Sequence, residues 1–147
     1  MATIVEDYCS FELAKLLKEK GFNISNISPG IKNWICCMYD ENGDIHWGIY
    51  DKNWYFRITF QMARRWLREV HNIDIDIDAA VGMLEIKVYI PYISTYKPLE
   101  EDSSKVRQIK RGIYYKDDKG VIPALQHFES YEQAVEIALK HVLENLI

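Results

Sequence analysis

The sequence predicts a single α+β domain over residues 1–147, with a mostly antiparallel sheet and three helices packed on it. Two observations carry this prediction. Within residues 59–78 the apolar period changes from helical spacing to the alternation of a strand, where Ile73, Ile75 and Ile77 alternate with aspartates. Turn signals also separate the other strand-like segments closely, which favours hairpins over parallel crossover units. A chain of 147 residues is long enough to bury its own core.

Three segments combine helical spacing with a start signal. Residues 11–20 follow Ser10 as N-cap, residues 60–71 follow Thr59, and residues 131–145 follow Ser130, which opens a capping box. In the second helix the apolar stripe is expected to face the core, and its members are Met62, Ala63, Trp66, Leu67 and Val70.

Turn residues divide most of the remaining chain into strands. A three-strand meander is predicted over residues 34–39, 45–50 and 54–58, with Asn42-Gly43 in its first turn. Residues 73–78 and 84–90 are predicted strands, and Pro91 places the second at an edge or near its end. Residues 94–111 are expected to form a long polar connection without regular structure, followed by a hairpin of residues 112–115 and 121–128.

Composition excludes several classes of protein. The net charge of -4 disfavours a strongly basic nucleic-acid binder. No apolar run is long enough to predict a membrane span, and the first ten residues do not form a secretory signal. Cys9, Cys36 and Cys37 make an odd count, which indicates free thiols in a reducing compartment. We therefore expect a cytoplasmic protein.

No phosphate loop, metal-binding pair or nucleophile elbow occurs in the sequence, so we predict no cofactor and no metal, and we favour binding over catalysis. Asp74, Asp76 and Asp78 share a strand face and could bind a divalent cation, but we interpret them as the solvent face of an amphipathic strand. His127 and Glu129 could exchange protons, but no nucleophile accompanies them, and we interpret them as a surface pair.

Three tryptophans fall one on each strand of the predicted meander: Trp34, Trp47 and Trp54. Such residues most often form the core beneath a helix, which is the interpretation we favour, because each buries a large apolar area. The alternative is an exposed aromatic platform for bases or sugars.

Basic residues gather in two segments, one on the second predicted helix opposite its apolar stripe and the other before residue 112. We interpret them first as solvated charge, because the net charge is negative. If the protein binds through charge, they are the surface that we predict for a phosphate backbone or an acidic protein. Its members are Arg64, Arg65, Arg68, Lys105, Arg107, Lys110 and Arg111.

Three segments of the sequence carry a resemblance. They are residues 11–22, residues 65–73 with the alternating strand that follows, and residues 130–147. They resemble short uncharacterised proteins carried by phages and mobile elements of gut Bacteroidetes. The resemblance involves structural helices and brings no functional residues with it. It implies an intracellular accessory role associated with a phage or mobile element.

These observations support a first hypothesis and two alternatives. The first is a small non-enzymatic accessory protein that binds and modulates a host or phage protein, with a role in counter-defence. The alternative is a sequestering protein for a small anionic ligand or nucleotide, built on the aromatic and basic residues. The second alternative is an enzyme with an unrecognised site, which requires His127, Glu129 or the aspartates to converge in a cleft. Homo-oligomerisation remains open.

Overall fold

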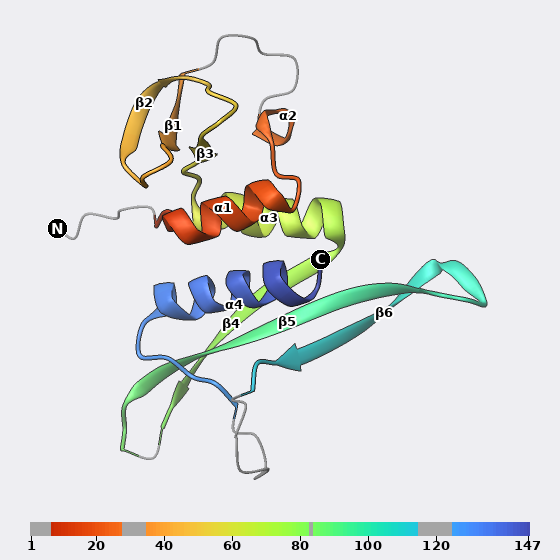
Figure 1. Cartoon of the computed structure of the whole chain (residues 1–147). Coiled ribbons are helices and arrows are strands. Elements are labelled where there is room, and N and C mark those ends of the chain that lie inside the picture. Colours follow the sequence, from red (N-terminus) through yellow and green to blue (C-terminus); the bar gives the residue numbers. More distant parts are fainter. Residues whose placement is uncertain (1–6, 28–34, 83, 115–124) are drawn as a thin grey trace, which may run out of the picture.

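The computed structural model describes residues 7–27, 35–82, 84–114 and 125–147. It is an α+β fold with antiparallel strands, as the sequence predicts, but the strands form two three-stranded sheets rather than one. Figure 1 shows the layers in order: the small sheet, then α1 and α3, then α4, then the large sheet. The elements are α1 (Phe11–Glu19), α2 (Ile24–Ile27), β1 (Ile35–Tyr39), β2 (Ile45–Ile49), β3 (Tyr55–Phe56), α3 (Phe60–His71), β4 (Ile73–Val81), β5 (Lys87–Leu99), β6 (Asp102–Gly112) and α4 (Tyr131–Asn145).

The three long helices begin where the capping residues predict. The side-chain oxygens of Ser10, Thr59 and Ser130 each accept a hydrogen bond from a backbone N–H of the first turn. At the end of α3, Asn72 adopts the left-handed conformation, with φ of 55°. Asparagine tolerates this region better than most residues, which lets the chain pass directly from α3 into β4.

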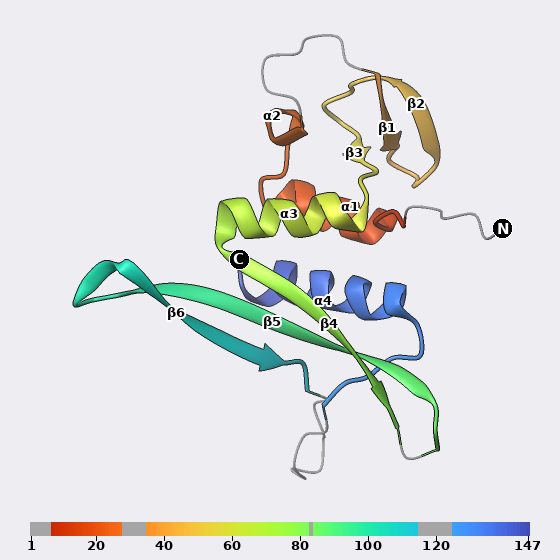
Figure 2. The same ribbon diagram turned by 180° about the vertical axis from the view of Figure 1, so that it is seen from behind.

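The small sheet has the strand order β2-β1-β3, so the predicted meander order is wrong. The third strand pairs with β1, where Met38 lies opposite Phe56, and both side chains are buried. Joining two core side chains on neighbouring strands explains why β3 crosses past β2 to reach β1. As a result, β2 lies at an edge of the sheet (Figure 2).

The large sheet has the order β4-β5-β6, and the expected irregular connection over residues 94–111 is wrong. Those residues complete β5 and form most of β6, which pair from Tyr92↔Gly112 to Pro98↔Val106. The hairpin extends beyond the helices (Figure 1), and most of its outer residues are exposed. Strands that face water on both sides need no apolar alternation, which is why the sequence pattern missed them.

Pro91 lies in the middle of β5, the central strand, and not at an edge or a strand end as predicted. Tyr89 exchanges backbone hydrogen bonds with Phe128, and β6 pairing with β5 ends at Tyr92↔Gly112. Backbone nitrogens two residues apart on a strand point to the same side, so the nitrogen of Pro91 points to the same side as that of Tyr89. On that side it faces the gap between Phe128, which pairs with Tyr89, and Gly112, which pairs with Tyr92. A residue without an N–H fits there without breaking a backbone hydrogen bond.

The core lies between α1, α3 and α4 and on the inner face of the large sheet. Ile73 and Ile75 of β4 are buried beneath the helices, as their alternation with aspartates predicts. In α3, Ala63, Trp66 and Leu67 are buried as expected. The stripe is narrower than predicted, however, and the remaining two members are exposed: Met62 by 38% and Val70 by 54%.

Three further observations concern the cysteines, the last predicted hairpin and the search for a membrane-spanning helix. Cys9, Cys36 and Cys37 are buried free thiols, and burial raises the pKa of Cys9 to about 12, with a smaller contribution from Glu136. One bridge, Tyr114↔Leu125, joins the described parts of the two arms of the predicted last hairpin, whereas Phe128 pairs with Tyr89 of β5. The predicted turn lies outside the described residues. Among the residues that the structure describes, no helix is long and apolar enough to cross a membrane.

Candidate functional site

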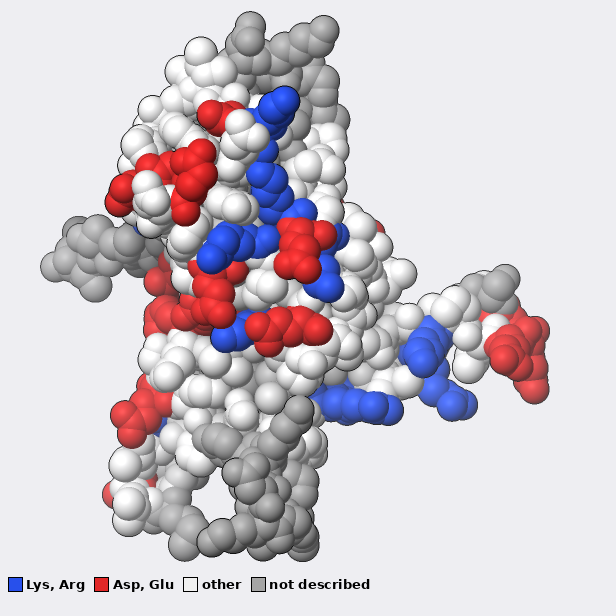
Figure 3. All heavy atoms as spheres, in the orientation of Figure 1, with Lys and Arg blue, Asp and Glu red and all other residues white. Residues whose placement is uncertain are grey.

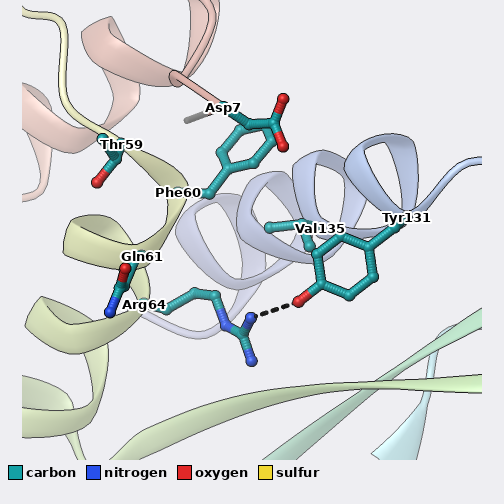
Figure 4. A pocket seen from close by; sticks show the side chains of 7 residues that line it. All are labelled: Asp7, Thr59, Phe60, Gln61, Arg64, Tyr131 and Val135. Atoms are coloured by element: carbon teal, nitrogen blue, oxygen red, sulfur yellow. Dashed lines mark hydrogen bonds between the residues drawn. The ribbon is translucent and has the colours of Figure 1, made fainter. Parts of the chain in front are cut away.

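A pocket of about 370 Å³ lies where the N-termini of α3 and α4 meet. Helix N-termini carry exposed N–H groups and the positive end of the helix dipole, so both favour negative charge nearby. Figure 4 shows Arg64 and Tyr131 at one side of this pocket and Asp7 with Phe60 at the other. The lining residues are Asp7, Thr59, Phe60, Gln61, Arg64, Tyr131 and Val135.

The half-buried Arg64 is the central side chain of this pocket. One guanidinium nitrogen donates to the Tyr131 hydroxyl at 2.9 Å, and the other donates to the carbonyl of Ile75 in β4 at 2.5 Å. Tyr131 is itself fixed by an edge-on contact with the ring of Tyr89, at 5.8 Å between centroids. Neutral oxygens of α4 and β4 therefore hold the guanidinium, and β5 supports it only indirectly, through the contact of Tyr89 with Tyr131.

The structure separates Arg64 from the other two predicted binding residues of α3. Arg65 pairs with Glu69 at 2.9 Å, and Arg68 lies 3.8 Å from Asp74. Both are exposed, whereas the expectation that Arg64 faces solvent beside them is wrong, because its position on the helix turns it toward β4 and α4. The α3 arginines thus form no uninterrupted basic face. Their role in binding stays a prediction.

The basic residues of β6 are exposed but do not share one face. Alternation along the strand places Arg107 and Arg111 on the α4 side of the sheet and Lys110 on the opposite side, over the ring of Tyr92. Lys105 lies further along, near the hairpin tip. Figure 3 shows basic side chains along this hairpin and acidic ones at its tip. The predicted basic surface is therefore broken up by carboxylates and by the two sides of the sheet.

An exposed apolar surface, which sequence reasoning missed, lies on the small sheet. Its members share one face of β1 and β2, because the sheet register places Ile35 opposite Ile49. We call them the β2 surface, and their exposed fractions are Ile35 67%, Ile45 50%, Trp47 71% and Ile49 68%. Alternation along residues 45–49 was a visible signal, but alternation alone does not say which face of a strand meets the core.

The tryptophans therefore differ from the expected buried core. Trp47 is the most exposed member of the β2 surface. Trp54 is half-buried and packs its ring on His46, at 4.8 Å between centroids. His46 also contacts Asp40 at 2.7 Å, and this contact lowers the pKa of Asp40. The predicted Trp34 lies outside the described residues.

The His127–Glu129 pair lines a groove of about 870 Å³ at the end of the β4–β5 hairpin. The groove is mainly apolar, with Leu84 and Ile86 among its residues, and Gln133 adds a polar group. No hydroxyl, thiol or amine side chain is among its described lining residues. Across the described ranges, no three His, Cys, Asp or Glu side chains gather as metal ligands would. The groove offers apolar contact, but its described residues include no serine, threonine, cysteine or lysine that His127 could activate as a nucleophile.

Comparisons with known proteins give no match to a family model, to a curated protein or to a solved structure.

Proposed function

We propose that this protein is a non-enzymatic binding protein that attaches to a partner protein through the β2 surface. In the setting that the sequence resemblance implies, the partner is a host or phage protein, the effect is to modulate its activity, and the role is counter-defence. The single observation that supports this proposal is the exposed apolar row of β2 and β1, with Trp47 at its centre. Contiguous exposed apolar side chains of this kind mark interaction sites.

The strand also has an open edge. In the described sheet β2 pairs with β1 on one side only, which leaves its other backbone edge available to a further strand. Edge strands that must stay unpaired usually carry charged residues or proline, and residues 45–49 contain neither lysine, arginine, aspartate, glutamate nor proline. An extended segment of a partner could therefore add to β2 through backbone hydrogen bonds, while Ile45, Trp47 and Ile49 supply apolar contacts.

The β2 surface is a better candidate than the basic surface for this role. Arg65 and Arg68 already face carboxylates of this chain, and releasing them for a partner would forfeit those contacts. The side chain of Trp47 is 71% exposed, so a partner can cover it without breaking an ion pair of this chain. Tryptophan is also one of the residue types that contribute most binding energy at interfaces.

The test compares capture by the wild-type protein and by two variants. Trp47→Ser removes the centre of the β2 surface, and Leu84→Ser removes an even more exposed apolar side chain, 82% against 71%, at the far end of the molecule. Proteins captured from host-cell and infected-cell lysates are quantified by mass spectrometry. We expect a partner that wild type and Leu84→Ser retain equally and that Trp47→Ser loses at least tenfold, with little change as salt rises, because apolar contacts are not screened.

A partner lost on joint replacement of Arg64, Arg65 and Arg68, but kept by Trp47→Ser, would instead assign binding to the basic residues. Capture that none of these changes affects would contradict a role for either surface.

A further inference from the structure

The three arginines of α3 differ in how their charges are compensated. Arg65 and Arg68 each face a carboxylate, at 2.9 Å and 3.8 Å. Arg64 is the least exposed of the three, yet within the described residues it has no carboxylate in ion-pair distance, and its two hydrogen-bond partners are neutral oxygens. A half-buried cation without a counter-ion is costly, so it favours an anionic group from outside the chain.

The surroundings of Arg64 suit a carboxylate in particular. Its remaining N–H groups have no acceptor among the described residues, and a guanidinium matches the two oxygens of a carboxylate. The Tyr131 hydroxyl accepts from Arg64, which leaves its own proton for donation to the same anion. The N-termini of α3 and α4 add favourable dipoles at this point.

The other side of the pocket has the opposite character. Asp7 places a carboxylate there, and its backbone is fixed because its carbonyl accepts a hydrogen bond from Phe60 N at 3.0 Å. Asp7 has no ion-pair partner among the described residues, although Arg64 lines the same pocket. The ring of Phe60 lies on this side as well (Figure 4). A carboxylate and an aromatic ring together suit an ammonium group.

We propose that this pocket binds a small zwitterion of the α-amino-acid class. The ligand's carboxylate bonds to Arg64 and the Tyr131 hydroxyl, and its ammonium group faces Asp7 and Phe60. A volume of about 370 Å³ accommodates such a molecule. Two unpaired opposite charges lining one pocket are satisfied together by a ligand that carries both, whereas a phosphate would be repelled by Asp7. The proposal is independent of partner binding at β2.

Isothermal titration calorimetry with free L-amino acids tests this inference, with L-leucine as the first probe. Three controls remove one feature at a time: N-acetyl-leucine lacks the ammonium group, leucinamide lacks the carboxylate, and inorganic phosphate supplies only an anion. We expect a free amino acid to bind at least tenfold more tightly than all three.

Variants locate the site. Arg64→Gln and Asp7→Asn should each weaken amino-acid binding at least tenfold, whereas Arg65→Gln, one residue along the helix, should leave it unchanged. Asp7→Asn should also narrow the difference between leucine and N-acetyl-leucine. Tyr131→Phe keeps the ring and removes only the hydroxyl, so it tests the anion side even where Arg64→Gln lowers the melting temperature through the lost bond to Ile75.

Two results would overturn the inference. One is the absence of heat for every free amino acid at millimolar concentration. The other is binding of phosphate or N-acetyl-leucine as tightly as leucine, which would define a simple anion site. Trp47→Ser should bind amino acids as wild type does, so this experiment and the partner-capture experiment fail separately.

Discussion

The same alternating pattern of apolar residues is buried in the large sheet and exposed in the small sheet. In β4, Ile73 and Ile75 are 5% and 3% exposed and pack beneath the helices, while the aspartates between them face outward. In β2 the alternating apolar side chains are the exposed ones, with Ile49 at 68% and Trp47 at 71%. The comparison teaches that alternation establishes a two-faced strand, and that only the neighbouring layers decide whether the apolar face is buried in the core or left exposed.

The largest expected effect contrasts two tryptophans, one in the core and one on the β2 surface. Trp66 is 5% exposed and lies edge-on to Phe22 at 5.5 Å between centroids. Trp66→Ala should destabilise the protein by about 3–5 kcal/mol, through lost burial and the cavity left behind. Trp47→Ala should change stability by no more than about 0.5 kcal/mol. Urea denaturation of both variants measures this, and equal losses would contradict the comparison.

The same contrast applies to isoleucines of the two sheets. Ile75→Ala in β4 should destabilise the protein by about 2–5 kcal/mol, because the side chain is buried under the helices. Ile49→Ala in β2 should stay within about 0.5 kcal/mol, since its side chain already faces water. Thermal melts show which of the two variants has the lower melting temperature, and we expect it to be Ile75→Ala. A large loss for Ile49→Ala would show that something covers the β2 surface in the isolated protein.

A smaller effect is expected at the helix between the sheets. The Thr59 hydroxyl accepts a hydrogen bond from Met62 N and caps α3. Thr59→Ala should cost about 1 kcal/mol, and Thr59→Ser should restore most of the loss because serine caps as well. Chemical denaturation of the pair checks this, and identical stabilities would exclude a capping role.

The smallest effect concerns the ion pair that joins α1, below the small sheet, to α4, above the large sheet. Glu12 and Lys140 lie 2.9 Å apart, and the hydrogen bond from Lys140 lowers the pKa of Glu12. The pair therefore stabilises the folded chain above the ordinary glutamate pKa of about 4.3, and its contribution is lost as pH falls through the lowered folded value. Glu12→Gln should melt slightly earlier at pH 7 and low salt.

The difference between wild type and Glu12→Gln should shrink below pH 4 and in high salt, since both conditions remove the attraction. A difference that persists under both conditions would assign the effect to packing.

Much of the fold was predictable because local chemistry determines it. The capping residues Ser10, Thr59 and Ser130 predicted the starts of three helices, and the alternation that begins at Ile73 predicted β4. The β5–β6 hairpin was not predictable, because its exposed residues carry no apolar period and are held by backbone pairing with a neighbouring strand. The position of Pro91 in a central strand was not predictable either, because the gap that accommodates it lies between residues 112 and 128, which are distant in the sequence.

The candidate sites divide in the same way. The sequence grouped Arg64, Arg65 and Arg68 by their positions on one helix. Only the packing of α3 against β4 and α4 places the Arg64 side chain in a pocket and leaves Arg65 outside it. Asp7 and Tyr131 are distant in sequence from Arg64 and from each other, so no local pattern could join them.

By itself, the sequence determined the α+β class, the positions of the long helices, the buried face of β4 and the absence of familiar catalytic motifs. These depend on periodicity and capping, which act over a few residues. The tertiary structure alone decided the strand order of the small sheet, the exposure of the β2 surface and the pocket around Arg64. These depend on which distant segments meet, because burial of a face and pairing of a charge are properties of neighbours in space.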